Sequence, residues 1–584
     1  MDNLETKIER WAREALSKEK ENKILIGNNA LINRRTYLSL EQLSIHMHIV
    51  GSSGMGKTFL LEHLVKTLID LKVGVCVIDP HGDLYQRLLK YVVRKRLEKK
   101  VILFDPNDRD WAVGLNYLEY DDENFSPTSH ASLVMRGISR VFGDENQDTK
   151  PQLSRWERDT LIPLIQTGQT LVEIPLFLAL HDGEVRKRLV EETENFNLEL
   201  EWKDFEAGTK QDRSVWSTPV LNRANKFILG DNIRRIVGQR KSTINFREAM
   251  DQGKVILVNL ACTKLSEEEQ KMLGVMVVDK VVQAAKSRSD IPEKKRRPFY
   301  FVIDEFGDFV CEDVARGLQA LRKFKVSMIL AHQELEQLRE DSRRVYSAVM
   351  ANPAVRLVFR TSREDAEKMA LEMFTGKIRD DVVKRVIKQT KYEPVETTRE
   401  VVTDGETETE SQSKTKGSSF GKNEGLSKAD VYPVGFLGLT DELVTVIKNT
   451  SESTSSSDNE AETEAQSHGF SHSVSKVPFH EYHPYKEITS VEDHSVQGII
   501  EKFISWIVNQ NPRHAQLKIG TYPPIPIITP EVKDMRVREK DVQKFKEYIY
   551  SRYAKRAEEV DQEIKERRKQ LLKEPIQEPI SFRE

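Results

Sequence analysis

A glycine-rich turn between an apolar run and an amphipathic segment constrains this chain more than any other feature. The stretch HIVGSSGMGKTFLLEHLV, residues 48–65, places three glycines close together directly before Lys57 and Thr58. The pattern G-x-x-x-x-G-K-[ST] in this setting predicts a strand, a phosphate-cradling loop and a helix. Backbone N–H groups of such a loop point inward at phosphate oxygens, and the positive end of the helix lies behind them. The alternative is a glycine turn before an ordinary helix.

The residues around this turn fit a nucleoside triphosphate with its magnesium ion. Lys57 is suited to neutralise the β- and γ-phosphates, and the Thr58 hydroxyl is suited to one coordination position of Mg²⁺. Apolar residues recur on one face of the following segment up to Leu68, as a helix packed under a sheet requires. The sequence therefore predicts ATP and Mg²⁺ as cofactors. The residues expected to bind the nucleotide are Gly51, Ser52, Ser53, Gly54, Met55, Gly56, Lys57, Thr58, Phe59 and Asp79.

Composition limits the class of protein. The chain has 584 residues, of which 38% are hydrophobic, enough for one large core and one or two smaller ones. A net charge of −3 argues against a protein that coats nucleic acid with its whole surface, so any contact with DNA must be local. Cys76, Cys262 and Cys311 are far apart and form no C-x-x-C motif, which fits a reduced cytosolic compartment.

The N-terminal segment does not resemble a signal peptide, because it is charged throughout. The most apolar run, residues 161–180, contains two prolines, two glutamines, a glycine and a glutamate, so it would span a bilayer poorly. We therefore expect a cytoplasmic protein without an intrinsic membrane span, held at a membrane only through a partner.

Apolar runs that alternate with helical patterns predict an α/β fold with a mostly parallel sheet and covering helices. Such runs lie between residues 24 and 120 and again between residues 254 and 362. Between residues 125 and 240 the β-rich runs give way to helical spacing, broken by four prolines, which predicts an inserted all-helical subdomain. Residues 515–519 and 525–529, a proline-bounded pair of apolar runs, are expected to form edge strands.

A change of composition after about residue 395 marks a further boundary. Ser, Thr, Glu, Gly and Asn dominate there, and such sequence buries too little apolar area to offset its chain entropy. An apolar island at residues 431–447 is a candidate for docking on the core. The expected parts are an N-terminal helix (1–23), a core in two pieces (24–124 and 241–395) around the helical subdomain (125–240), a mostly mobile insertion (396–476), a return to the core (477–530) and a charged C-terminal helix with a tail (531–584).

Polar residues at the ends of predicted strands supply the rest of the expected site. The run FYFVIDEF ends in Asp304 and Glu305, where the strand reaches the surface. Asp304 is suited to order the Mg²⁺ shell, and Glu305 is suited to accept a proton from the attacking water. Gln333 ends the run KVSMILAHQ, and a glutamine beside the phosphate loop is suited to hydrogen-bond the γ-phosphate or the water. For Gln333 the alternative is an ordinary surface residue.

Other side chains have two possible roles. Asp79 follows a strand and either approaches the metal shell or shapes the next turn, and Asp83 is a candidate cap for the next helix. Phosphoryl transfer usually needs an arginine that stabilises the transferring group, here supplied by the same chain or by a neighbouring copy. Arg322 and Arg360 belong to the expected catalytic set, although each has a salt-bridged surface residue as its alternative. The full set of candidates is Arg322, Arg356, Arg360 and Arg363.

Two basic clusters and a C-terminal stripe each allow two interpretations. Residues 292–298 and 377–391 are rich in Lys and Arg, which is typical of a solvated loop or of a DNA contact. A charged helix is expected from about residue 535 to 575. Its narrow apolar stripe is suited to packing on a partner or on the chain's own core.

With these residues in place, the chain resembles the HerA/FtsK superfamily of P-loop motors, especially the TraD- and TraG-like conjugative coupling proteins of the TraM-recognition type. The resemblance covers most of residues 24–375 and extends in patches to about residue 530. It implies a RecA-like core, a helical insertion and a hexameric ring that threads DNA. In it, Lys57 and Thr58 match the phosphate and metal contacts, Asp304 and Glu305 the second acidic motif, and Gln333 the sensor. The motifs that carry it include HIVGSSGMGKT, VCVIDPHGDL, PFYFVIDEFGDFV, LRKFKVSMILAHQELEQL and VRLVFRTSREDAEKMA.

The function expected from these features is an ATP-driven DNA translocase, an ATPase that moves DNA in conjugative or mobile-element transfer. Its expected partners are DNA, five further copies in a homo-hexameric ring, and a relaxosome, a secretion channel or a nuclease. Membrane-anchored coupling proteins carry N-terminal transmembrane helices that this sequence lacks, so a HerA-like motor working with a nuclease in DNA processing or phage defence is a second hypothesis. A third is an ATP-binding switch or scaffold that does not translocate, for which a poised base at Glu305 is unnecessary.

Overall fold

The computed structural model describes residues 23–120, 126–142, 150–181, 183–261, 265–309, 312–374, 383–409, 467–493 and 496–573. The chain forms two compact units, one made of residues 1–384 with 493–584 and the other of residues 385–492. The expected N-terminal helix, except for its last residue, and the apolar island at 431–447 lie outside the described residues.

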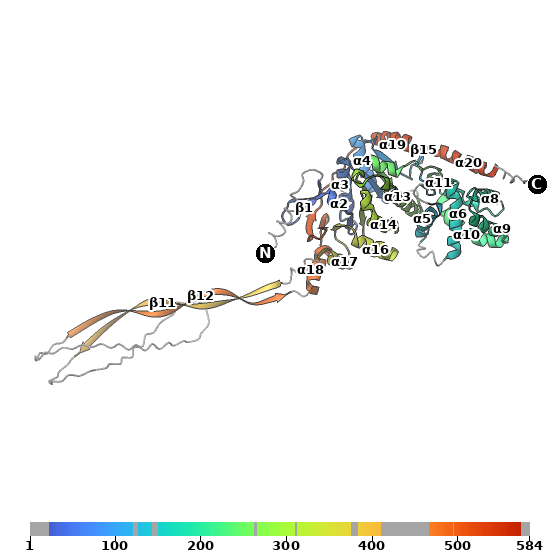
Figure 1. The fold of residues 1–584 in the computed structure, drawn as a ribbon. Helices are drawn as coiled ribbons and strands as arrows, with labels where there is room; N and C mark the ends of the chain where they lie inside the picture. The colour runs from blue at the N-terminus through green and yellow to red at the C-terminus, as the bar shows by residue number, and fades with distance from the viewer. Residues whose placement is uncertain are drawn as a thin grey trace, which may run out of the picture. The chain divides into compact units, whose positions relative to one another are not determined.

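An 11-stranded sheet lies at the centre of the larger unit, in the order β2-β1-β14-β13-β10-β3-β9-β8-β4-β7-β5 (Figure 1). Neighbouring strands from β10 to β5 are parallel, whereas β13, β14, β1 and β2 pair antiparallel. The mostly parallel sheet predicted from the sequence is confirmed. Its strands are β1 (Lys23–Asn29), β2 (Arg35–Ser39), β3 (Met47–Val50), β4 (Gly74–Asp79), β5 (Val101–Phe104), β7 (Val255–Asn259), β8 (Phe299–Ile303), β9 (Val326–His332), β10 (Val355–Val358), β13 (His514–Ile519) and β14 (Ile525–Ile528).

The parallel strands are buried on both faces. Every residue of β3, β4, β7, β8 and β9 is buried, which is why their sequences read as continuous apolar runs rather than as alternating ones. Because these strands are parallel, the residues that follow β3, β4, β8 and β9 all emerge at the same edge of the sheet. This carboxyl edge gathers the expected functional residues.

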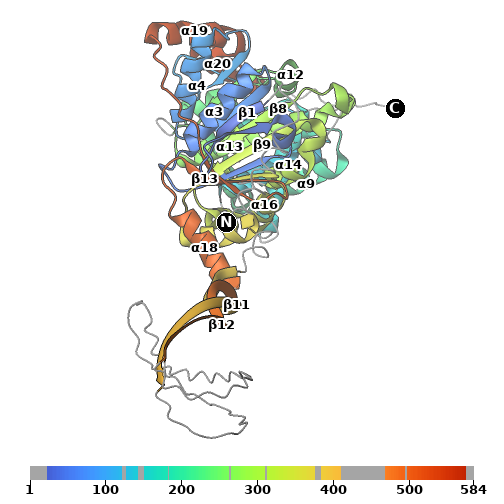
Figure 2. The same ribbon diagram turned by 90° about the vertical axis from the view of Figure 1, so that its left-hand side faces the viewer.

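Helices cover the sheet on both faces (Figure 2). The helices α3, α4 and α19 form one contacting group, and α12, α13, α14 and α16 form another. The helices outside the insertion are α2 (Leu40–Leu43), α3 (Lys57–Asp70), α4 (Asp83–Lys95), α12 (Phe246–Gln252), α13 (Glu267–Ser287), α14 (Glu312–Ala320), α15 (Leu335–Asp341), α16 (Arg343–Ala351), α17 (Arg363–Phe374), α18 (Val496–Val508), α19 (Glu539–Tyr553) and α20 (Ala557–Lys573), with the 3-10 turns η3 (Arg288–Asp290), η4 (Glu293–Lys295), η5 (Phe306–Phe309) and η6 (Leu321–Phe324).

Residues 127–237 form the helical insertion. An aromatic cluster around Trp156, Trp202, Phe205 and Trp216 packs α6, α9 and α10 together. Prolines do not break all of these helices as expected, because one lies inside α6 and another inside α10, where packing offsets the lost hydrogen bond. The elements are α5 (Pro127–Val141), α6 (Pro151–Gln166), η2 (Leu171–Glu173), α7 (Ile174–Phe177), α8 (Glu184–Glu191), α9 (Phe196–Ala207), α10 (Lys210–Ile228) and α11 (Asp231–Val237).

One expectation about strands is wrong. The runs at 515–519 and 525–529 correspond to β13 and β14, which are interior strands, because an unpredicted hairpin of β1 and β2 pairs with β14 and forms the true edge. Of the insertion expected at 396–476, the structure describes the two ends. Residues 396–409 lie in β11 (Val383–Thr409) and residues 467–476 in β12 (Ser467–Asp493), which pair as a separate two-stranded sheet. Frequent Val, Thr and aromatic residues favour the extended backbone there.

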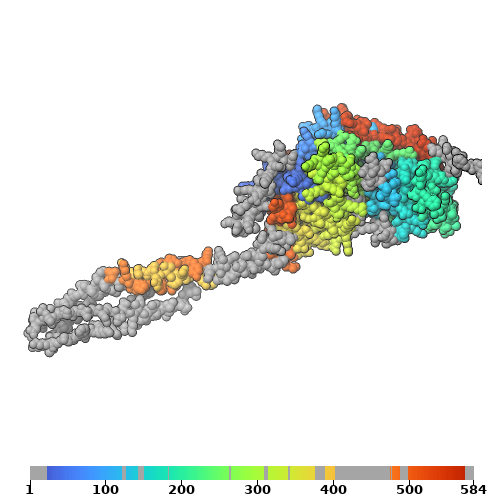
Figure 3. Space-filling view, viewed as in Figure 1, coloured from blue at the N-terminus to red at the C-terminus, as the bar shows by residue number. Residues whose placement is uncertain are grey.

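The C-terminal helices pack on the chain's own larger unit. Figure 3 shows α19 and α20, in red, along the surface of that unit beside the blue residues of α4. The helix α19 contacts β5 and α4, and α20 contacts α11. Between the two helices, β15 (Lys555–Arg556) pairs with β6 (Trp111–Ala112). Of the two expectations for this segment, packing on its own core is the one observed.

Within the described ranges, no helix has both the length and the apolar character that crossing a membrane would require.

Candidate active site

The phosphate loop is wedged between the ends of two strands. The Gly51 N–H donates to the His332 carbonyl at the end of β9 (3.3 Å), and the Ser52 N–H donates to the Arg360 carbonyl after β10 (2.8 Å). A side chain at Gly51 would meet the Cβ of Phe359 at 2.5 Å, so only glycine allows this close approach. Gly56, at a φ of 106°, caps the start of α3 in the left-handed region. The glycine spacing therefore has a local cause in the backbone.

Lys57 is the first residue of α3, and its side chain is only 5% exposed. Its ammonium donates to the carbonyl of Gly51 (2.6 Å) and lies 3.7 Å from Oε1 of Glu305. Burial lowers the pKa of Lys57, and the neighbouring carboxylates of Glu305 and Asp304 oppose that shift. The cation thus lies inside the loop, where a bound phosphate would be.

Thr58 and Asp304 form the expected metal pair. The Thr58 hydroxyl donates to Oδ2 of Asp304 at 3.2 Å, although 246 positions separate the two residues. Burial, together with the charges of Glu305 and Asp79, raises the pKa of Asp304 to about 7. The carboxylates of Glu305 and Asp304 therefore lie near the Lys57 ammonium, the charge of Asp79 acts on Asp304, and the Thr58 hydroxyl meets the Asp304 carboxylate. This donor set and this excess of negative charge fit a Mg²⁺ ion.

Glu305 has a strained backbone and a fixed side chain. Its φ of 44° lies in the left-handed region, which costs energy for a residue with a side chain. The Gln333 amide donates to Oε1 of Glu305 at 2.9 Å. Strain of this kind is typical of functional sites, where surrounding contacts hold a residue in one orientation. Gln333 therefore lies beside Glu305 and orients its carboxylate.

Asp79 has the structural role that was one of its two alternatives. Its carboxylate accepts from the backbone N–H groups of His81 (2.9 Å) and Tyr85 (2.7 Å), so it shapes the turn into α4. The expected cap at Asp83 is wrong, because Gly82 is the cap residue and Asp83 is already helical. Asp79 is nevertheless close enough to raise the pKa of Asp304 by its charge.

The other loop residues have different surroundings. Met55 is buried, Ser53 and Gly54 are exposed, and Ser52 is half-buried. Phe59 is 42% exposed, and the Arg87 guanidinium lies 4.6 Å from the centre of its ring. Phe59 is thus the one apolar residue of the expected nucleotide set that presents substantial surface to solvent.

The four arginine candidates differ in their position and in their contacts. Arg360 is exposed just after β10, and its backbone supports the phosphate loop. Arg322 lies in η6, before the start of β9, so it is at the edge of the sheet opposite to Gln333 and does not join its own chain's site. Arg356 is buried and donates to the Met350 carbonyl. Arg363 forms an ion pair with Glu501 at 2.7 Å.

Three residues beside the loop were not predicted. The imidazoles of His48 and His332 stack at 4.9 Å between ring centres, with their Nε2 atoms 2.7 Å apart. Burial lowers the pKa of both, that of His332 to about 4. Arg513, at a φ of 69°, donates its backbone N–H to the Met55 carbonyl (2.9 Å). Polar residues inside buried apolar runs, as in MHIV and ILAHQ, were the available signal for the histidine pair.

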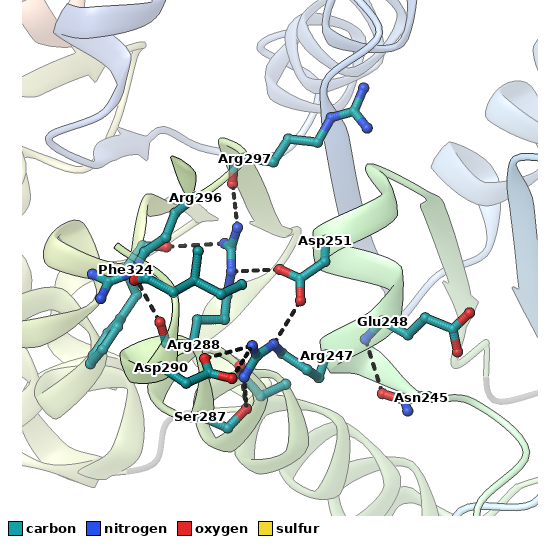
Figure 4. A network of polar contacts seen from close by, with 12 residues as sticks. Asn245, Arg247, Glu248, Asp251, Ser287, Arg288, Asp290, Arg296, Arg297 and Phe324 are labelled. Atoms are coloured by element: carbon teal, nitrogen blue, oxygen red, sulfur yellow. Dashed lines mark hydrogen bonds and ion pairs between the residues drawn. The ribbon is translucent and has the colours of Figure 1, made fainter. Parts of the chain in front are cut away.

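The two arginines of the basic cluster at 292–298 are engaged in internal contacts, in the region that Figure 4 shows. Arg296 donates to the carbonyls of Arg288 and Ile291, and Arg297 donates to the Gln252 carbonyl at 3.0 Å. The fully buried Arg288 donates to the Arg297 and Phe324 carbonyls. These arginines fasten the loop before β8. Of the cluster at 377–391, residues 383–391 lie in β11 and the others lie outside the described residues.

Comparison with protein families gives two matches along the chain. Residues 26–212 match the family described as helicase HerA, central domain. Residues 232–411 match the type IV secretion-system coupling protein DNA-binding domain. A curated but uncharacterized protein of Aquifex aeolicus (strain VF5) is 35% identical over 54 residues, which is 9% of this chain. The chain spans only 20% of the length of that relative.

Solved structures also align with the chain. The plasmid coupling protein TrwB in complex with ADP and Mg²⁺ is 17% identical, with a TM-score of 0.49, over 91% of this chain and 94% of that one. An unbound form of the bacterial conjugative coupling protein TrwB is 14% identical, with a TM-score of 0.46, over 91% and 93%. VirB4 of Thermoanaerobacter pseudethanolicus is 14% identical, with a TM-score of 0.41, over 62% and 91%.

Proposed function

Because this chain belongs to the HerA/FtsK superfamily, in its coupling-protein-like branch, we propose that it is an ATP-driven DNA translocase. The observation that carries the proposal is the convergence of distant residues on one phosphate loop. The Lys57 ammonium lies 3.7 Å from Glu305, and Gln333 donates to the same carboxylate at 2.9 Å. A loop that only binds a nucleotide does not need an oriented carboxylate beside its lysine.

The residues divide the work of hydrolysis between them. The backbone of residues 51–56 and the Lys57 ammonium bind and orient the β- and γ-phosphates of ATP. Thr58 and Asp304 would hold Mg²⁺, and the ion would supply positive charge against the phosphates. Glu305 takes the proton of the attacking water, and Gln333 keeps Glu305 aimed at it. The left-handed backbone of Glu305 sets the direction in which its side chain leaves the strand end, and the hydrogen bond from Gln333 orients its carboxylate.

We infer that the working form is a homo-hexameric ring on DNA. One geometric observation supports an assembly: Arg322 lies at the edge of the sheet opposite to its own site. If Arg322 acts in catalysis, it acts on the nucleotide of a neighbouring copy.

Two further roles remain as alternatives to conjugative transfer. A HerA-like motor that works with a nuclease would use the same site, and it is favoured only by the match of residues 26–212 to the HerA central domain. A switch or scaffold would bind ATP without translocating. The contact between Gln333 and Glu305 favours the motor over the scaffold, because it positions a base.

The test is ATP turnover with and without single- and double-stranded DNA, on material sized by light scattering. We expect turnover to rise several-fold with DNA in the wild type. Lys57→Ala should lose nucleotide binding and turnover, whereas Glu305→Gln should keep binding and lose turnover by at least about 100-fold. The exposed Glu558→Gln is the matched control and should behave as the wild type. DNA-independent turnover in a correctly assembled sample would favour the scaffold.

A further inference from the structure

The amino-terminal edge of the parallel sheet, opposite to the candidate active site, is rich in basic residues. Each of five neighbouring parallel strands begins there after at least one lysine or arginine, which either adjoins the strand or is separated from it by a single residue. Some of these side chains have internal partners, since Arg296 donates to the carbonyls of Arg288 and Ile291 and Arg297 donates to that of Gln252. The basic residues before β4, β5, β7, β8 and β9 are Lys72, Lys99, Lys100, Lys254, Arg296, Arg297, Lys323 and Lys325.

Beside the start of β5, this edge carries an open groove of about 860 Å³ between the end of α4 and the start of α19. Its basic lining comes from both helices and from the turn that leads into β5. Two carboxylates, Glu98 and Asp541, also line it. The basic lining residues are Arg94, Arg96, Lys99, Arg536, Arg538 and Lys544.

Most of this positive charge is uncompensated. Asp541 is engaged by Arg538, with Nε 2.9 Å from Oδ2. In the described part of the chain, the exposed side chains of Arg94, Lys99 and Arg536 form no ion pair within 4.0 Å and no hydrogen bond. By comparison, the neighbouring Lys95, which faces away from the groove lining, pairs with Asp70 at 2.9 Å. Several unpaired cations facing one cavity repel one another, so the groove favours a ligand with several negative charges.

We propose that this groove binds the phosphodiester backbone of a nucleic acid, independently of base sequence. At about 860 Å³ the groove is far larger than one small anion needs, so it has room for part of a nucleic-acid backbone. Tyr548 lines it and is 41% exposed, which offers an aromatic face to an unstacked base. An acidic protein segment fits less well, because such a partner needs apolar anchors, and Phe545, the large apolar residue of the lining, is only 3% exposed.

This site is separate from the ATP site. The strands that carry Asp304 and Gln333 end at the carboxyl edge, whereas the groove lies at the edge where β5 begins. The helix α4 connects the two edges, since it begins three residues after Pro80 beside the site and ends at Lys95 beside the groove. The inference rests on the proposed function in that DNA is taken as the substrate. It adds a second place where that substrate is held.

The test measures binding of a fluorescent oligonucleotide of mixed sequence, without ATP, at salt concentrations from about 50 to 200 mM. The groove variant is Arg94→Glu/Lys99→Glu/Arg536→Glu in the full chain. The matched control, Lys565→Glu/Arg568→Glu/Lys569→Glu, makes the same change of charge at exposed positions of α20. Single-stranded and duplex forms are measured in parallel. A milder Arg94→Gln/Arg536→Gln variant covers the case in which the triple reversal fails to fold.

We expect the groove variant to bind at least about tenfold more weakly at low salt than the wild type and the control. The slope of log K against log salt should become less steep by about 2 for a single strand or about 3 for a duplex, because three cations are lost. The milder variant should lose about 1.4 from the single-strand slope. Basal ATP turnover without DNA should be unchanged in all of them.

Three results would overturn the proposal. The first is equal binding by the groove variant and the control. The second is competition by a poly-glutamate peptide as strong as that by unlabelled oligonucleotide, which would identify an acidic protein partner. The third is a groove variant whose assembly state by light scattering differs from that of the wild type, but which binds the oligonucleotide normally when samples of equal assembly state are compared. That result would identify the groove as a contact between copies. If the wild type does not hydrolyse ATP but its oligonucleotide binding still depends on the groove, the proposed function is contradicted and the groove proposal is not.

Discussion

Single residues of the candidate site were predictable to different degrees. Lys57 and Thr58 belong to a local motif, and Asp304 ends an apolar strand, so sequence patterns identified them. The stack of His48 on His332 joins residues 284 positions apart, and no local pattern specifies that pairing. The left-handed backbone of Glu305 was also not predictable, because it is imposed by tertiary contacts against the residue's own preference. Sequence thus identified the chemical groups but not the contacts that hold them.

Gln333 provides the most specific residue-level prediction. Gln333→Ala removes the amide that donates to Oε1 of Glu305, so the carboxylate is free to turn away from the water. We expect kcat to fall by about 10² while KM for ATP changes little, because only an interaction used in the transition state is lost. Steady-state ATP hydrolysis measures both constants. A rise in KM at unchanged kcat would show that Gln333 binds the nucleotide instead.

The buried histidine pair predicts how stability depends on pH. The pKa of His332 is about 4 in the folded chain and about 6.5 when unfolded, so the unfolded state binds more protons between these values. The contribution of neutral His332 to the free energy of unfolding is therefore fully present above pH 6.5. It is lost as the pH falls toward 4, by up to about 1.4 kcal/mol per pH unit.

In His332→Asn, the free energy of unfolding should fall less steeply between pH 6 and 4.5, by up to about 1.4 kcal/mol per pH unit, because the titrating group is gone. Denaturant midpoints at several pH values measure the effect, and the exposed His81→Asn is the control. The same pH dependence in wild type and His332→Asn would contradict the account of the buried pair.

At the scale of elements, the buried parallel strands were the easiest to predict. Their two-sided burial makes each one a continuous apolar run, which few other elements resemble. Other strands contain many polar residues, so no apolar run in the sequence indicated them. These are the hairpin of β1 and β2 and the long pair of β11 and β12. As a result, the predicted domain boundaries at residues 395 and 476 lie inside strands that the structure assigns to a separate unit.

The C-terminal helix α20 supplies a prediction at this scale. Arg567 is 6% exposed, and its guanidinium donates to Glu173 (3.0 Å) and to the Gly238 carbonyl (2.7 Å) in the helical insertion. Arg567→Ala leaves a buried carboxylate without its partner, which should lower the free energy of unfolding by about 3 to 5 kcal/mol.

The adjacent Arg568 is exposed, so Arg568→Ala should change the same free energy by less than about 0.5 kcal/mol. Thermal unfolding of both variants at one scan rate compares them directly. Equal melting temperatures would mean that α20 is not fastened to the insertion as the structure shows.

At the scale of the whole molecule, the proposed motor has two separated sites. The carboxyl edge of the sheet holds the groups proposed to bind and hydrolyse ATP, and the amino-terminal edge holds an uncompensated basic groove. Parallel strands place these two edges at opposite ends of the same rigid sheet. Sequence patterns predicted the first edge through its motifs. The basic groove at the amino-terminal edge was not predicted, because its cations come from segments that are more than 400 positions apart.

The central claim is that ATP hydrolysis at Lys57 and Glu305 moves this protein along DNA. Displacement of a fluorescent third strand from duplex DNA reports such movement directly. We expect the assembled wild type to release the third strand only when ATP and Mg²⁺ are both present. Glu305→Gln should release none, although it still binds ATP. A wild-type assembly that hydrolyses ATP on this DNA yet leaves the third strand in place would contradict the account.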